Sequence, residues 1–253
     1  MKFKCDFTSE HYFETLEHAQ KEYQIGPVKN FLQKQKNEKN IFLRHDVDFS
    51  LDYALEMAQS EEKHGFSSTF FILLHSDFYN PYSVKGKEVI SKIASLGHEI
   101  GLHYDTRFLS KDIQKSKEQI KNQILTLEYI SSSCVISAAP HIPSETQDII
   151  INLKELDILN TRGEDILKDV FYISDSGRYW RNGCMCSHIG KYNNIQILTH
   201  PIWWAENSRS IKKQLDLFIE RESTKLISNI GDYKKMVTRL LTELHAPKEN
   251  FEI

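Results

Sequence analysis

The sequence has few of the residues that mark special classes of protein. Only 4 of its 253 residues are cysteine, 6 are proline and 10 are glycine. These cysteines are too few and too scattered to form a disulfide scaffold. In a reducing compartment they would remain thiols. With 40% hydrophobic residues, the chain is typical of a globular protein with a sizeable core and not of a disordered one.

Long apolar runs and an excess of one charge are missing as well. The longest uninterrupted apolar run, residues 70–74, is far too short to span a bilayer, and the N-terminus lacks the apolar core of a signal peptide. The net charge of −3 comes from interspersed lysine and glutamate, without the basic stripe that nucleic-acid binding requires. We therefore expect no transmembrane segment, no nucleic-acid partner and a cytoplasmic location.

One cysteine spacing invites a functional interpretation. Cys184 and Cys186 flank Met185, and two thiols so close could hold a soft metal. Because the chain offers no second cysteine pair, we favour two loop or core thiols and assign them no function.

Short apolar runs alternate with helical periodicity along most of the chain. Apolar residues recur at helical spacing from Leu51 to Ala58, in a helix that Ser50 caps and Gly65 ends. The same patterns predict further helices around 89–96, at 110–129 and 144–156, and a charged helical tail from 208. They predict strands at 41–43, 69–74, 99–103, 134–139, near 158, and at 170–173 and 195–199.

Strand followed by helix, about seven times, predicts an α/β fold with parallel strands and helices packed outside. At this length the pattern favours a (β/α) barrel, with an open doubly wound sheet as the alternative. We expect a single domain over 1–253, with its core at about 40–205, an N-terminal extension at 1–39 and a helical tail at 206–253. In either architecture, functional side chains gather at the carboxyl ends of the strands.

Five polar residues stand where predicted strands end: Asp46, Asp48, His103, His141 and His200. Asp46 and Asp48 would share one side if the chain stays extended. Two carboxylates so close cannot both stay ionised in a dry cavity without a cation. A divalent ion, Zn²⁺ or a similar metal, held by Asp48, His103 and His141 would resolve the conflict and leave Asp46 to take a proton from water.

Simpler interpretations exist for each of these residues. Asp48 could be only an N-cap or first-turn charge of the following helix, and His141 only a hydrogen-bonded loop residue. The run from His98 to His103 does not fit a zincin motif, which needs two histidines four apart on a helix. On a strand these two histidines point to opposite faces, and His103, at the carboxyl end, is the candidate ligand.

With these residues in view, the chain resembles the polysaccharide deacetylase family, also called the NodB-homology or carbohydrate esterase family 4 group, from about Phe42 to Trp204. It is most similar to the branch whose first motif is His-Asp-Val-Asp. Asp46 and Asp48 match this motif, residues 97–103 match the Gly-His-Glu-Ile-Gly-x-His lead into the second motif, and 198–200 match the late Leu-x-His motif.

The resemblance implies a distorted (β/α) barrel of about seven strands and hydrolysis of an N-acyl, sometimes O-acyl, group on a sugar. It implies Asp46 as general base, His200 as general acid, and Asp48 and His103 as ligands of a divalent metal. We expect Zn²⁺, with Co²⁺, Ni²⁺ or Fe²⁺ as alternatives.

The chain departs from the family pattern at two places. The second motif normally continues to another histidine, but Arg107 stands there, and a guanidinium cannot ligate a cation. We infer that His141 supplies the missing ligand, with Asp105 as the fallback. The usual arginine of the third motif is also missing, so Arg44, Arg107 or Arg178 would have to orient Asp46.

We expect Arg44, Arg107 and Trp180 to contact the substrate, although a tryptophan is more often a packing residue. An N-acylated sugar, a nucleotide sugar or a small glycan is the expected substrate, in the biosynthesis of a surface polysaccharide. The alternatives are a non-catalytic carbohydrate-binding or scaffold protein with a degenerate metal site, and a metal-dependent O-deacetylase or other amidohydrolase. The sequence does not indicate the oligomeric state.

Overall fold

The computed structural model describes residues 6–141, 152–205 and 210–243. The chain divides into two compact units, Met1–Asn207 and Ser208–Ile253. This boundary lies close to the start of the expected helical tail. The expectation of a single domain stays a prediction.

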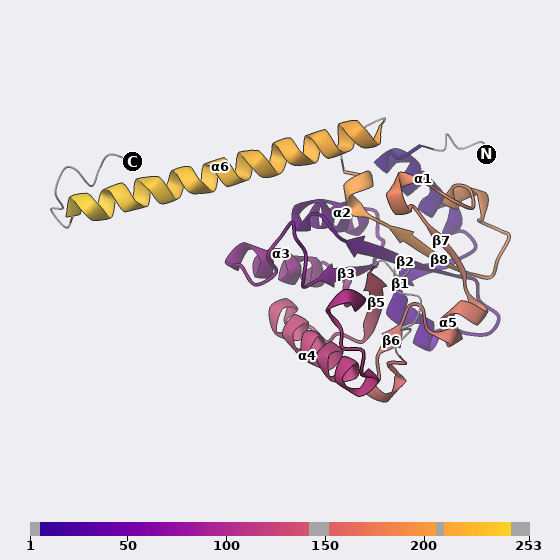
Figure 1. The fold of residues 1–253 in the computed structure, drawn as a ribbon. Helices are drawn as coiled ribbons and strands as arrows, with labels where there is room; N and C mark the ends of the chain where they lie inside the picture. Colours follow the sequence, from indigo (N-terminus) through magenta and orange to yellow (C-terminus); the bar gives the residue numbers. More distant parts are fainter. Residues whose placement is uncertain (1–5, 142–151, 206–209, 244–253) are drawn as a thin grey trace. The chain divides into compact units, whose positions relative to one another are not determined.

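The first unit is built on one sheet of parallel strands (Figure 1). Along the sheet the order is β6-β5-β4-β3-β2-β8-β7, seven strands in a curled arrangement, which confirms the expected distorted (β/α) barrel. A short additional strand, β1, pairs with residues 40–43 of β2, while β3 pairs with residues 44–47 of the same strand. The strands are β1 (Gln24–Pro27), β2 (Asn40–Val47), β3 (Thr69–Leu73), β4 (Glu99–Asp105), β5 (Ser137–His141), β6 (Leu159–Asn160), β7 (Phe171–Ser174) and β8 (Asn194–Thr199).

Helices occupy the connections between these strands (Figure 1). The α-helices of the first unit are α1 (Ser9–Ala19), α2 (Leu51–Lys63), α3 (Val84–Ser95), α4 (Ile113–Ser131) and α5 (Glu164–Asp169). Short 3₁₀ turns are η1 (Val28–Gln33), η2 (Thr106–Phe108), η3 (Lys154–Leu156), η4 (Ser176–Arg178), η5 (Met185–Ser187) and η6 (Pro201–Trp203). The Ser50 hydroxyl accepts from the Tyr53 N–H, as expected for the cap of α2.

Three segments differ from the sequence-based expectation. The strand expected at 134–139 occupies Ser137–His141, so His141 ends a strand instead of following one. Of the helix expected at 144–156, residues 144–151 lie outside the described residues, and the described remainder contains the turn η3. The N-terminal extension contributes α1 and β1 to the first unit, which hydrophobic periodicity alone did not indicate.

Strand β2 presents two chemically different faces. Every second side chain, Phe42, Arg44 and Asp46, points to the inside of the barrel. This inner face therefore changes from apolar to charged toward the carboxyl end of the strand. Phe42 packs in a buried cluster with Phe71 and Ala139 that closes the bottom of the barrel. Gly101 of β4 is required there, because a Cβ at this position would lie 2.4 Å from the Phe71 ring.

The outward face of β2 is tied to the helices by a buried polar cluster around Glu61 of α2. The Glu61 carboxylate accepts hydrogen bonds from the hydroxyls of Tyr12 and Ser68 and contacts His45 Nε2 at 3.0 Å. Because Glu61 is fully buried, these contacts replace the hydration that the carboxylate loses. The cluster therefore fixes α1 and α2 against the strand that carries Asp46.

Within its described residues, 210–243, the second unit forms one long helix, α6 (Ile211–Glu243), which agrees with the expected helical tail. It carries exposed apolar side chains such as Leu226 and Ile230, interspersed with charged residues. In the described part of the chain, none of the helices combines the length and the apolar character that crossing a bilayer requires.

Candidate metal and catalytic site

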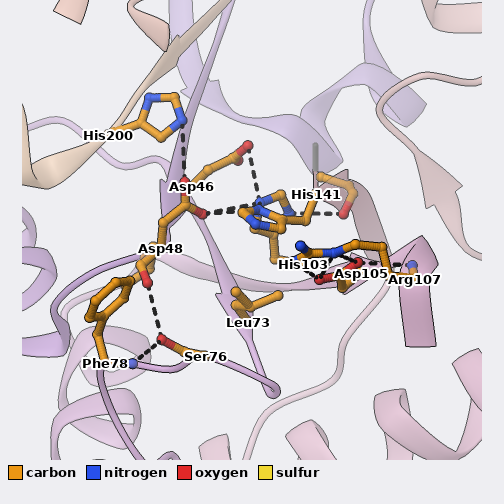
Figure 2. Close-up of polar contacts among 12 residues, drawn as sticks. Asp46, Asp48, Leu73, Ser76, Phe78, His103, Asp105, Arg107, His141 and His200 are labelled. Atoms are coloured by element: carbon orange, nitrogen blue, oxygen red, sulfur yellow. Dashed lines mark hydrogen bonds and ion pairs between the residues drawn. The ribbon is translucent and has the colours of Figure 1, made fainter. Parts of the chain in front are cut away.

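The five polar residues expected at one mouth do meet there. Asp46 lies near the end of β2 and Asp48 follows its last residue, while His103 and His141 come from the ends of β4 and β5. His200 follows β8 directly. Figure 2 shows His103 and His141 approaching the two aspartates from one side and His200 from the other.

The backbone at Asp48 is held from a neighbouring loop. The Tyr79 hydroxyl donates to the Val47 carbonyl at 2.6 Å. The Ser76 hydroxyl donates to the Asp48 carbonyl at 3.0 Å (Figure 2). Helix α2 is capped by Ser50, and its first-turn acidic residue is Asp52. The simpler interpretation of Asp48 as a helix cap is therefore wrong, and its side chain is available to the site.

Three potential ligand atoms face a common point. His103 Nε2 lies 3.1 Å from His141 Nδ1 and 3.3 Å from Asp48 Oδ1, and His141 Nδ1 lies 3.4 Å from the same oxygen. Ligand atoms about 2.0–2.1 Å from a tetrahedral Zn²⁺ lie roughly 3.3–3.4 Å from one another. The three distances thus approximate one face of such a coordination shell.

The protonation pattern of these residues also suits a metal. His103 Nδ1 contacts the Ala139 carbonyl at 2.9 Å, and donation there leaves the Nε2 lone pair directed at the site. Among the described residues, none donates a hydrogen bond to the buried Oδ1 of Asp48. An orphaned buried carboxylate oxygen is costly, and a cation would satisfy it. The residues present therefore fit a divalent ion.

Electrostatics at the site favour positive charge. Burial by itself raises the pKa of Asp48, but the imidazoles of His103 and His141 outweigh it and hold that pKa well below its usual range. Burial likewise lowers the pKa of His103, but the carboxylates of Asp46 and Asp48 outweigh it and raise that pKa. The carboxylates that attract a proton to His103 would equally attract a metal ion in its place.

Arg44 holds Asp46 in a bidentate ion pair. Its Nε donates to Asp46 Oδ1 at 3.0 Å and its Nη2 to Oδ2 at 2.8 Å, while Nη1 donates to Thr161 and Gln196. The pKa of Asp46, which burial raises, is thereby lowered overall, with a further contribution from His103. Of the arginines considered from the sequence, Arg44 is the one placed to orient Asp46, and its guanidinium is engaged with these partners.

A second carboxylate positions His200. Asp175, which follows β7, contacts His200 Nδ1 at 2.5 Å and accepts from the His200 N–H and from Trp204 Nε1. Burial lowers the pKa of His200, but Asp175, Asp48 and Asp46 outweigh it and raise the pKa to about 9. Its Nε2 lies 3.7 Å from Asp48 Oδ2, so an imidazolium N–H faces the centre of the site.

Arg107 lies apart from this network. It forms a bidentate ion pair with Asp105, through Nε at 3.0 Å and Nη2 at 2.6 Å, and its side chain is 54% exposed (Figure 2). Asp105, the fallback ligand, is thus occupied by Arg107, and His141 completes the group with Asp48 and His103. Arg107 is not among the residues that line the cavity above the site.

That cavity has a volume of about 450 Å³. Asp46, Asp48 and the three histidines lie at its base, and Arg162, Trp180 and Arg181 contribute to its walls. Trp180 also packs on Phe7 and Trp204, with ring centroids 6.0 and 6.4 Å away. It therefore serves the packing of the rim and faces the cavity at the same time.

Sequence reasoning missed the partner of His200. Asp175 was not among the candidate residues, although an aspartate just after the predicted strand 170–173 was a usable signal. The sequence also gave no indication that Arg44 donates to Thr161 and Gln196, because neither residue belongs to a recognisable motif.

No family model and no curated protein matches the chain. Solved structures do match it. A carbohydrate esterase family 4 (CE4) pseudoenzyme from Bacillus anthracis is 16% identical, with a TM-score of 0.45, over 76% of this chain and 63% of its own. The chain is similar to CE4 proteins. A family 4 acetyl xylan esterase from Clostridium thermocellum, in complex with a cobalt ion, is 12% identical over 73% of this chain and 84% of its own, with a TM-score of 0.46.

A mutant of the peptidoglycan deacetylase PdaC from Bacillus subtilis is 18% identical over 84% of this chain and 98% of its own, with a TM-score of 0.44. The chain spans only 63% to 65% of the length of the first pseudoenzyme structures that it matches. The first two of these structures are described as members of carbohydrate esterase family 4. At 12% to 18% identity and TM-scores of 0.44 to 0.46 these matches carry no argument about the site, whose chemistry is derived from this chain's own residues.

Proposed function

We propose that the protein is a metal-dependent hydrolase that removes an N-acyl group, acetyl or formyl, from a sugar or glycan intermediate. The observation that carries this proposal is the group of three ligand atoms 3.1 to 3.4 Å apart, from Asp48, His103 and His141. A carboxylate held by Arg44 and an imidazole held by Asp175 flank that group. A base and an acid on either side of a metal position are the groups that amide hydrolysis needs.

Asp48, His103 and His141 would hold the ion, and their oxygen and nitrogen donors suit Zn²⁺ best, with Co²⁺, Ni²⁺ or Fe²⁺ as alternatives. When bound, the ion polarises the acyl carbonyl and lowers the pKa of water at the site. Asp46 Oδ2, 3.6 Å from His103 Nε2, accepts the proton of the attacking water. The water oxygen bonds to the acyl carbon, the carbon–nitrogen bond breaks, and His200 Nε2 donates a proton to the leaving nitrogen, giving a carboxylic acid and an amine.

The cavity suits a sugar that carries an anionic group. Its volume of about 450 Å³ is in the range of small-molecule sites, and the indole of Trp180 offers a flat face for a sugar ring. Arg162 and Arg181 line the same cavity, and guanidinium groups recognise phosphate well. These residues support a nucleotide sugar as the substrate, ahead of a neutral small glycan.

The test is release of acetate or formate from a panel of N-acetylated and N-formylated amino sugars and their nucleotide derivatives, with Zn²⁺ or Co²⁺ added. We expect turnover with at least one N-acyl nucleotide sugar. Replacement of Asp46 by asparagine should lower kcat by roughly 10²–10⁴-fold and leave the metal content unchanged, because Asp46 is not a ligand. Full activity of Asp46→Asn at neutral pH would refute its role as the base.

The matching O-acetylated sugars separate an amidase from an esterase. A sugar alkoxide leaves more easily than an amide nitrogen, so an esterase should depend less on His200 than an amidase does. Metal-free wild-type protein that binds sugars without turnover would instead indicate a carbohydrate-binding protein.

A further inference from the structure

A second group of metal-ligating side chains lies away from the cavity, between the N-terminal helix and the loop after β7. His11 of α1, Cys184 and Cys186 each offer one ligand atom, and these atoms lie within 4.8 Å of one another. His11 Nε2 is 3.0 Å from Cys184 Sγ, although the two residues are 173 positions apart in the sequence. His11 and Cys184 are buried, and Cys186 is half-buried.

The local backbone brings the two cysteines to the same side of a turn. Gly183 adopts φ 87°, a conformation that favours glycine, and its N–H donates to the Trp180 carbonyl at 3.2 Å in a turn just before Cys184. The Cys184 carbonyl then accepts from both the N–H and the hydroxyl of Ser187, at 2.9 and 2.7 Å. Met185, between the cysteines, is fully buried and anchors the turn.

The separations suit a thiolate and imidazole site. Zn–S bonds of about 2.3 Å and Zn–N bonds of about 2.0 Å place tetrahedral ligands roughly 3.5–3.8 Å apart. The observed range, from 3.0 Å to at most 4.8 Å, brackets those values. The buried His11 ring already lies with its Nε2 3.0 Å from the Cys184 sulfur, so this nitrogen is in place to share a metal ion with the thiolate.

We propose that His11, Cys184 and Cys186 bind one Zn²⁺ ion that fastens the loop after β7 to helix α1. Two soft thiolates and an imidazole select zinc over the hard cations magnesium and calcium. Within the described ranges this group has three members, so the fourth tetrahedral position is left to solvent.

The site has a consequence for the cavity. The loop that carries both cysteines also carries Trp180 and Arg181, which line the cavity, and Trp180 packs on Phe7, just before α1. A metal at His11 would hold this wall of the cavity in place without contacting the substrate. The role is structural, and it does not depend on the hydrolase activity proposed above.

Metal analysis of the full chain, loaded with zinc and desalted, tests the site. We expect Asp48→Ala, which removes the ligand at the strand ends, to retain one zinc per chain. Adding Cys184→Ser and Cys186→Ser to it should lower the content to none, whereas adding Cys134→Ser, which changes an exposed thiol, should leave it at one. An unchanged zinc content after loss of Cys184 and Cys186 would overturn the proposal.

Cobalt substitution identifies the ligands directly. Thiolate ligands give Co²⁺ a sulfur-to-metal charge-transfer band in the near ultraviolet, which the oxygen and nitrogen donors of Asp48, His103 and His141 cannot give. The band should persist in Asp48→Ala and disappear in His11→Ala with Cys184→Ser. Its absence in the wild type would refute the site even if the cobalt binds at the strand ends.

The wild-type protein provides a test that requires no variant to fold. Alkylation followed by peptide mapping should label Cys134 with or without zinc, and should label Cys184 and Cys186 only after a chelator has removed the metal. Trypsin should then also cleave faster after the exposed Arg181. Equal labelling and cleavage before and after chelation would contradict a metal at this position.

Discussion

The ion pair between Arg44 and Asp46 allows a sharp test of how burial determines the contribution of a charge to stability. Both side chains are nearly inaccessible, with 2% and 5% of their surface exposed. Replacing Arg44 by methionine leaves the Asp46 carboxylate buried without its counter-ion and leaves Thr161 and Gln196 without their donor. Breaking a buried pair from one side costs about 3–5 kcal/mol, so we expect Arg44→Met to lose about 4 kcal/mol of unfolding free energy.

The chain contains a matched control for this substitution. Arg107 also forms a bidentate pair with an aspartate two residues away, Asp105, at similar distances, but 54% of its side chain is exposed. Exposed ion pairs contribute little, so Arg107→Met should cost less than about 1 kcal/mol. The two variants differ mainly in the burial of the arginine.

Equilibrium unfolding in urea, followed by tryptophan fluorescence, measures both effects. All three tryptophans lie in residues 1–207, so the signal reports on the unit that contains the site. The double variant Arg44→Met with Asp46→Asn should recover at least about 1 kcal/mol, since no unpaired carboxylate remains buried. If Arg44→Met costs no more than Arg107→Met, the pair does not carry the energetic role that its burial implies.

Three further outcomes follow from the site and its support. His141→Ala should abolish binding of the metal at the strand ends, measured by competition with a chelator, and wild-type affinity would exclude it as a ligand. Asp175→Asn should lower kcat on the order of 10²-fold and shift the alkaline limb of the pH profile downward, since Asp175 contributes most among the carboxylates that overcome burial and raise the pKa of His200 to about 9; an unchanged profile would contradict this. For Glu61, burial raises the pKa, but His45 outweighs it and the pKa is lowered overall. Its stabilisation is present above the ordinary glutamate pKa of 4.5 and is lost as pH falls through the folded-state value. Thermal unfolding of Glu61→Gln should therefore depend less on pH in the acid range than that of the wild type.

The local pattern of apolar residues was sufficient to predict most of the helices and strands and the residues at the mouth of the barrel. Runs such as 69–74 and helices such as 51–63 depend on which neighbours in the sequence are apolar, so a single chain reveals them. Parallel strands place their carboxyl ends together, and this rule brought Asp46, Asp48, His103, His141 and His200 to one place before any coordinates. The predicted boundaries of β5 differ from the observed ones, because an apolar run in the sequence does not mark where hydrogen bonding to β4 begins.

Contacts between segments that are distant in the sequence could be identified only from the tertiary structure. Arg44 lines the cavity, and its expected contact with the substrate stays a prediction, but only the structure reveals that its guanidinium binds Asp46, Thr161 and Gln196. The choice of His141 over Asp105 depends on the ion pair with Arg107, since a carboxylate so engaged is not free to ligate. His11 and Cys184 meet across 173 positions because α1 packs beside the loop after β7, and no periodicity encodes which helix packs beside which loop. Sequence determined which side chains could perform chemistry, and packing decided which of them meet.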